Sequence, residues 1–127
     1  MAVKAMPGAL CACFLAACTP TDGPLDTSRL SDVFIQDFDS SDPAGCTTAD
    51  VDLTHDEALS FFQRAKPLSA VQVADNYPLA PCKVEGTLRR DGQACEFEIS
   101  AAMTGMIQCG DARWHFACDD CAALFVP

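Results

Sequence analysis

Cysteine is the residue that most constrains how this chain can fold. The chain has nine cysteines among 127 residues, which is a high density for so short a protein. Such a density predicts either disulfide bonds formed in an oxidising compartment or a metal site. Which of the cysteines belong to the folded part depends on how the N-terminal segment is interpreted.

The first 17 residues have the pattern of an export signal. Lys4 supplies one positive charge near the amino terminus, and the run from Ala9 to Ala17 is apolar and rich in small residues. This is the short basic region and short apolar region of a signal peptide. The run is far below the ~20 apolar residues that a membrane-spanning helix needs. Cys11 and Cys13 lie inside it and are expected to be removed with it.

The apolar run ends in Leu15-Ala16-Ala17-Cys18, which resembles the lipobox of bacterial lipoprotein precursors. The resemblance covers residues 1–18. It implies cleavage before Cys18, attachment of a diacylglycerol to the Cys18 sulfur, and a lipid-anchored protein of the cell envelope. An Asp directly after the lipidated cysteine would resemble an inner-membrane retention signal, but this chain has Thr19 there. We therefore expect the protein to be anchored in the outer membrane and to face the periplasm. The alternative is an ordinary secretory signal.

Residues 18–53 are predicted to be the lipidated cysteine and a flexible acidic tether. From Asp22 to Glu57 there are ten acidic residues and one base, and several Pro and Gly residues interrupt any regular element. Val33-Phe34-Ile35 is more apolar than a spacer requires and could form an edge strand. Asp37 to Asp42 alternates oxygen ligands as calcium loops do, but it lacks the Gly and Glu of an EF-hand loop.

Residues 54–127 are predicted to be the folded domain, and it begins with a helix. Thr54 and Glu57 form a capping-box pattern at its start. Apolar residues then recur at helical spacing, and Pro67 ends the helix. The members of this stripe are Ala58, Phe61, Phe62 and Ala65. We therefore expect one amphipathic helix of about three turns, at 3.6 residues per turn.

Beyond the helix the apolar period changes to two, which predicts strands. Val71 and Val73 indicate a short strand. Four longer alternating stretches follow, in which the apolar residues are Cys82, Val84 and Leu88; Cys95, Phe97, Ile99 and Ala101; Met103, Ile107 and Cys109; and Ala112, Trp114, Phe116 and Cys118. The fold class that this predicts is α+β, with one amphipathic helix packed on a four-stranded antiparallel sheet.

The turn between the first two long strands contains Asp91-Gly92, a strong hairpin signal. A two-residue loop would place Glu85 opposite Glu98, and opposed carboxylates destabilise a sheet. We therefore expect a four-residue loop that places Arg89 opposite Glu96. A real pair of Glu85 and Glu98 would instead indicate a cation site or a catalytic site.

Six cysteines remain after Cys18, and an even number in an exported domain predicts a disulfide framework. Six cysteines allow fifteen connectivities. Four of them fall on the apolar positions of their strands and are expected to point into the core. The expected pairs are Cys82–Cys95, Cys46–Cys109 and Cys118–Cys121.

Two alternatives concern the C-terminal cysteines. Cys118-Asp-Asp-Cys121 has the spacing of a thiol–disulfide redox pair, although the two aspartates disfavour a reactive thiolate. His115 precedes this pair at a spacing that could bind zinc. His115 lies on the opposite strand face from Cys118, however, so a shared metal would require a bend.

No pattern in the sequence indicates catalysis. There is no nucleophile elbow, zinc-protease motif or phosphate loop, so we predict no catalytic residue, metal ligand or cofactor. The net charge of −10 argues against a nucleic-acid partner, because phosphates would be repelled. The expected function is a membrane-anchored, non-enzymatic domain that binds a protein of the envelope, as inhibitor and immunity-type lipoproteins do. The alternatives are a redox protein or a metal-binding lipoprotein.

Overall fold

The computed structural model describes residues 23–126, so the predicted signal peptide and the predicted acylation site Cys18 lie outside the described residues. One antiparallel sheet has the strand order β1-β3-β4-β5-β6-β2. Its strands are β1 (Leu30–Ser40), β2 (Lys66–Leu68), β3 (Cys82–Arg90), β4 (Gln93–Ser100), β5 (Thr104–Cys109) and β6 (Ala112–Ala117). The helices are α2 (His55–Arg64) and α3 (Ala70–Asn76), with 3-10 turns η1 (Thr27–Arg29), η2 (Thr48–Val51) and η3 (Ala122–Leu124).

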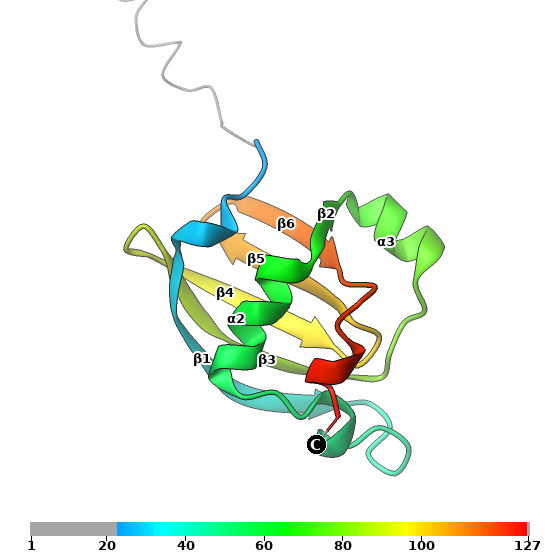
Figure 1. Cartoon of the computed structure of the whole chain (residues 1–127). Coiled ribbons are helices and arrows are strands. Elements are labelled where there is room, and N and C mark those ends of the chain that lie inside the picture. Colours follow the sequence, from blue (N-terminus) through cyan, green and yellow to red (C-terminus); the bar gives the residue numbers. More distant parts are fainter. Residues whose placement is uncertain (1–22, 127) are drawn as a thin grey trace, which may run out of the picture.

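Helix α2 forms where the capping box predicted it. The Thr54 hydroxyl accepts from the Glu57 amide, and the Glu57 carboxylate accepts from the Thr54 amide. The helix lies across one face of the sheet, which we call the inner face, between the edge strands β1 and β2 (Figure 1). It buries Ala58, Phe61 and Phe62. Phe62 meets Phe97 and Phe116 edge to face, with ring centroids 5.6 and 5.3 Å away.

The α+β class is confirmed, but the sheet has six strands where four were expected and there are two helices where one was expected. The expected strand through Val71 and Val73 is wrong, because these residues lie in α3. Ser69 caps that helix, and the Gln72 side chain completes a capping box. Val71 is 67% exposed, so the two valines do not mark one buried face of a strand.

The expected flexible tether over residues 18–53 is also wrong from Gly23 onward. Strand β1 pairs with β3 from Leu30↔Arg90 to Ser40↔Cys82, with two bulges, so Val33-Phe34-Ile35 does belong to an edge strand. The folded domain therefore begins before residue 54. The physical reason is burial: Leu30, Cys46 and Val51 are all part of the hydrophobic core, which offsets the cost of ordering an acidic segment.

The β3–β4 hairpin has a two-residue turn, so the expected four-residue loop is wrong. Asp91 and Gly92 both have positive φ, 49° and 84°, as a tight two-residue hairpin turn requires. Glu85 consequently does lie opposite Glu98. The repulsion that argued against this register is relieved by Lys83, whose Nζ lies 3.5 Å from Glu85 and 3.3 Å from Glu98.

Three disulfides join the six expected cysteines, but two of the expected pairings are wrong. The structure pairs Cys46 with Cys82 and Cys95 with Cys109, in place of Cys82–Cys95 and Cys46–Cys109, and it forms Cys118–Cys121 as expected. The reason is register. Cys95 lies opposite Leu88, near the far end of β3 from Cys82, whereas Cys82 lies beside the end of β1.

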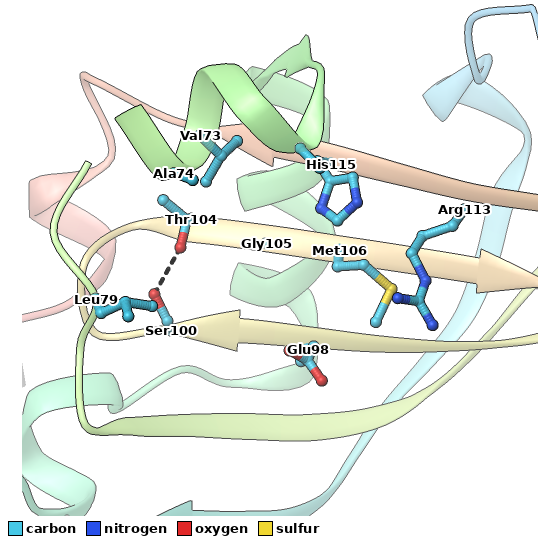
Figure 2. Close-up of a pocket in the computed structure, with 11 residues that line it drawn as sticks. Val73, Ala74, Leu79, Glu98, Ser100, Thr104, Gly105, Met106, Arg113 and His115 are labelled. Carbon is cyan, nitrogen blue, oxygen red and sulfur yellow. Dashed lines mark hydrogen bonds between the residues drawn. The ribbon is translucent and has the colours of Figure 1, made fainter. Parts of the chain in front are cut away.

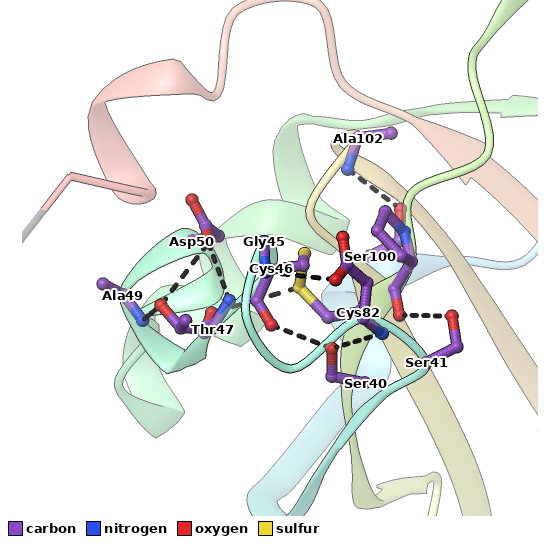
Figure 3. Close-up of a disulfide and its surroundings, with 12 residues drawn as sticks. Ser40, Ser41, Gly45, Cys46, Thr47, Ala49, Asp50, Cys82, Ser100 and Ala102 are labelled. Carbon is purple, nitrogen blue, oxygen red and sulfur yellow. Dashed lines mark hydrogen bonds between the residues drawn. A yellow bond between two sulfur atoms is a disulfide. The ribbon is translucent and has the colours of Figure 1, made fainter.

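The Cys46–Cys82 disulfide closes the loop that follows β1 (Figure 3). The Ser40 hydroxyl donates to the Cys46 carbonyl and accepts from the Asp42 amide. The amides of Gly45 and Cys46 donate to the Asp42 carbonyl. Asp42, which belonged to the possible calcium loop, is thus part of a hydrogen-bonded turn.

Candidate functional site: a groove under helix α3

The outer face of the sheet, opposite α2, is only partly covered. Helix α3 packs against β6 at one side of this face, and a groove of about 400 Å³ lies between the helix and the strands (Figure 2). We call it the outer groove. Its lining residues are Ala70, Val73, Ala74, Leu79, Glu98, Ser100, Thr104, Gly105, Met106, Arg113 and His115. All the strand residues among them except Gly105 have side chains that point away from the α2 side.

A three-residue contact holds α3 in this position. The Tyr77 hydroxyl donates to Asp119 at 2.7 Å, and the Lys66 ammonium donates to the same carboxylate at 2.9 Å. These two hydrogen bonds hold the pKa of Asp119 below its usual value, and Asp119 in turn raises the pKa of Lys66 and of Tyr77. The end of α3 is therefore tied to the segment that follows β6 and to the start of β2.

The groove floor carries a half-buried histidine, His115. Burial lowers its pKa below the usual value, Arg113 lowers it further, and Glu98 acts in the opposite direction. His115 is therefore neutral at pH 7, because the unperturbed pKa of histidine is about 6.5. The side chain extends from β6 into the groove, between α3 and Arg113 (Figure 2).

A pair of carboxylates continues the floor towards β1. Lys83 bridges Glu85 and Glu98. Partial burial opposes the charge on Lys83, but the attraction of Glu98 and then Glu85 raises its pKa above the usual value. A second hollow of about 240 Å³ adjoins the outer groove here and shares Glu98 and Met106 with it. It is also lined by Gln36, Asp37, Glu85, Gly86, Thr87, Glu96 and Phe97.

The rim of the outer groove is apolar and open to solvent. Leu79, which follows α3 and lines the groove, is 98% exposed, and Val73 and Ala74 of α3 line the same wall. An exposed apolar side chain at the edge of a hollow can add contact area for a bound partner.

The polar groups of the groove do not form a catalytic arrangement within residues 23–126. The Ser100 hydroxyl is shared with Thr104 at 2.8 Å and accepts from the Ala102 amide, so no base is paired with it. Within the described residues the His115 imidazole has no side-chain hydrogen bond that affects its charge state; only burial, Arg113 and Glu98 do so. The groove therefore offers shape, apolar contact and charge, which are the means of binding.

The residues singled out from sequence lie elsewhere. Cys118 and Cys121 are 2% and 0% exposed and are joined by a disulfide, so they do not form an open redox pair. His115 lies on the outer face, apart from that disulfide. Two clusters of possible metal ligands occur among the described residues, Cys46–Asp50–Cys82 and Cys118–Asp120–Cys121, and both cysteine pairs in them are disulfides. The redox alternative and the metal-binding alternative therefore gain no support from the described residues.

Sequence reasoning missed the outer groove because it interpreted α3 as a strand. The signal that could have revealed the helix is Ser69 with Gln72 three residues later, the same kind of capping pattern that correctly located α2.

No helix within residues 23–126 is long and apolar enough to cross a membrane. No known protein family, curated protein or solved structure matches the chain.

Proposed function

We propose that the chain is the precursor of a lipid-anchored envelope protein whose domain binds a protein partner without catalysis. Two features support the anchor and the compartment. The lipobox-like residues Leu15-Ala16-Ala17-Cys18 supply an acylation site. The three disulfides are of the kind that persist in an oxidising compartment. Thr19, which stands in place of the Asp of an inner-membrane retention signal, favours the outer membrane, with the domain in the periplasm.

The observation that carries the binding function is the outer groove with its exposed rim. Leu79, Val73 and Ala74 offer apolar contacts on one wall, and carboxylates line the adjoining hollow. Asp37, Glu85, Glu96 and Glu98 lie there, and Lys83 is shared by two of them. The surplus of negative charge favours a partner segment that carries basic and apolar side chains. An inhibitor or immunity-type protein, which must hold a specific partner, fits this arrangement.

Site-specific cross-linking in the native envelope tests this function. A photoreactive amino acid is placed at Leu79 in the full chain, with a matched position at Asp52, which is exposed but lies outside the outer groove. We expect one protein to be cross-linked from Leu79 and not from Asp52. The cross-linked segment, identified by mass spectrometry, is then synthesised as a peptide and titrated against the purified chain.

The charge of the groove provides the second part of the test. Glu98→Gln is expected to weaken binding of that peptide about tenfold, since a hydrogen bond to a charged group contributes roughly 1.5 kcal/mol or more. Asp52→Asn is the matched control and should leave the affinity unchanged. Equal cross-linking from both positions, or an affinity insensitive to Glu98→Gln, would overturn the assignment of the outer groove. A substrate turned over by the domain would overturn the non-enzymatic function.

A further inference from the structure

The point where the chain enters the domain is fixed by one contact. The Trp114 indole donates from Nε1 to the Gly23 carbonyl at 3.0 Å. Only four residues, 19–22, separate Gly23 from Cys18 in the sequence, and that stretch can span at most ~17 Å. A domain of about 100 residues has a radius of gyration of about 13 Å. If Cys18 is acylated, as proposed above, the tether is therefore shorter than the domain is wide.

The region around Gly23 is one end of the domain, which we call the hairpin end. It consists of η1 with its flanking residues (26–32), the β3–β4 turn with its flanking residues (89–93) and the β5–β6 turn with its flanking residues (109–113), which lie together beside the N-terminal segment (Figure 1). Side chains connect these parts. Arg29 of η1 donates to Asp91 at 3.0 Å, and Arg90 lies 5.1 Å above the ring of Trp114.

The hairpin end differs in charge from the rest of the domain. Residues 23–126 carry seven bases and seventeen acids, because Lys4 and Asp22 of the full chain precede Gly23. The hairpin end has four of those bases and four of those acids, namely Arg29, Arg89, Arg90, Arg113, Asp26, Asp32, Asp91 and Asp111. The remainder keeps three bases and thirteen acids. All of the net negative charge of the domain thus lies away from Gly23.

We infer that the hairpin end is a membrane-docking surface that rests on the phospholipid headgroups around the anchor. The occupant is an anionic lipid surface, because arginine binds phosphate and the rest of the domain is repelled by it. Within the described residues, Arg90 and Arg113 have no carboxylate within 4.0 Å, whereas Arg29 and Arg89 do. Arg90 lies over the Trp114 ring and Arg113 donates to the Gln108 side chain, so the positive charge of both is left without a paired carboxylate. The short tether keeps this end within reach of the headgroups. The inference rests on the acylation of Cys18.

The chain's single tryptophan makes this orientation measurable. The acylated protein is purified from membranes and reconstituted in vesicles containing phosphatidylglycerol and a lipid with a nitroxide on its headgroup. We expect Trp114 fluorescence to be quenched at least about twofold more than that of a tryptophan introduced by Leu79→Trp in a Trp114→Phe background. Leu79 precedes the start of β3, and Arg90 ends that strand. The length of β3 from Cys82 to Arg90 is about 27 Å, so the two tryptophan positions lie at opposite ends of the domain.

Matched charge variants identify the residues responsible. Arg90→Gln with Arg113→Gln should reduce the quenching difference on anionic vesicles, each variant being normalised to vesicles without nitroxide. Arg64→Gln removes a positive charge outside the hairpin end and should leave the difference unchanged. Equal quenching at the two tryptophan positions, or an equal effect of Arg64→Gln and of the Arg90→Gln, Arg113→Gln variant, would overturn the docking surface.

Mass spectrometry of the N-terminal peptide distinguishes failure of the docking inference from failure of the proposed lipid anchor. An acylated Cys18 with equal quenching at both positions would overturn the docking surface alone. A chain without acyl modification at Cys18 would overturn both the lipid anchor and the docking inference.

Discussion

The two faces of the sheet are built for different purposes. The inner face is covered by α2 along its length and holds fully buried side chains, including Phe61, Phe62 and Phe116. The outer face is covered only at one side by α3, and what lies between them is a groove with a polar floor and an exposed apolar rim. The comparison indicates that the inner face supplies most of the buried core, while the outer face holds the groove to which the proposed function assigns binding.

The largest expected effect tests that division directly. Phe62→Ala should destabilise the domain by about 3–5 kcal/mol, the usual cost of removing a buried aromatic side chain, because Phe62 is fully buried between Phe97 and Phe116. Val71→Ala on α3 should change the free energy of unfolding by less than about 0.5 kcal/mol. Denaturant unfolding of the two variants measures both values. Similar losses would show that α3 contributes as much to stability as the core does.

Removing a disulfide should give the next largest loss of stability. The size of the loss should depend on the length of chain that the disulfide closes. Cys46–Cys82 closes 36 residues and Cys118–Cys121 only 3. Loop-closure entropy predicts a loss of about 4 kcal/mol for replacing the first pair with Ser or Ala and about 2 kcal/mol for the second. Denaturant midpoints of the two double variants measure the order. A larger loss at Cys118–Cys121 would mean that its buried packing, and not chain entropy, is the stabilising term.

Parts of this fold were predictable because the signal was local. The capping box at Thr54 and the apolar stripe of α2 depend on neighbouring residues only, and the structure confirms them. The strand at Val71 and Val73 was wrong because two valines fit either period, and only tertiary exposure distinguishes them. The tether was wrong because residues such as Leu30 and Val51 are too widely spaced to form a local pattern, yet each fills a place in the core.

The register of the β3–β4 hairpin shows a different limit of prediction from sequence. Glu85 and Glu98 repel each other when only directly opposed residues are considered, but Lys83, two positions from Glu85 on the same face, contacts both carboxylates. The outer groove could not be inferred at all from the sequence, because it requires the position of α3 relative to strands that follow it in the chain. Its polar residues come from β4, β5 and β6.

Replacing Lys83 tests how the two carboxylates are tolerated on the outer face. Lys83→Met should destabilise the domain by about 0.5–1 kcal/mol, since it leaves Glu85 and Glu98 opposed without a cation. Adding Glu98→Gln should recover most of that loss, because only one charge then remains. Chemical denaturation of the single and double variants at low salt measures this. A double variant no more stable than Lys83→Met would show that the carboxylates do not repel each other measurably.

The pKa of Lys83 sets the pH range of that contribution. Its value is raised in the folded protein, so the stabilisation is fully present below the unfolded pKa of about 10.4 and is lost as pH rises through the folded value. The difference in stability between the wild-type chain and Lys83→Met should therefore be constant from pH 6 to pH 9, a window placed on these lysine pKa values.

The smallest expected effect concerns His115, which lies in the outer groove and not in the core. Its pKa is lowered in the folded protein, first by burial and then by Arg113, so folding favours the neutral imidazole. Stability should therefore be highest above the unfolded pKa of about 6.5 and should fall as pH drops through that value and the lower folded one. His115→Gln should remove this part of the pH dependence, which unfolding midpoints at pH 7.5 and pH 5 would measure. Because protonated His115 adds positive charge beside Arg113, a cationic partner segment should also bind more weakly at the lower pH in the wild type than in His115→Gln. Identical pH profiles for the two proteins would mean that the groove does not restrain the charge state of its histidine.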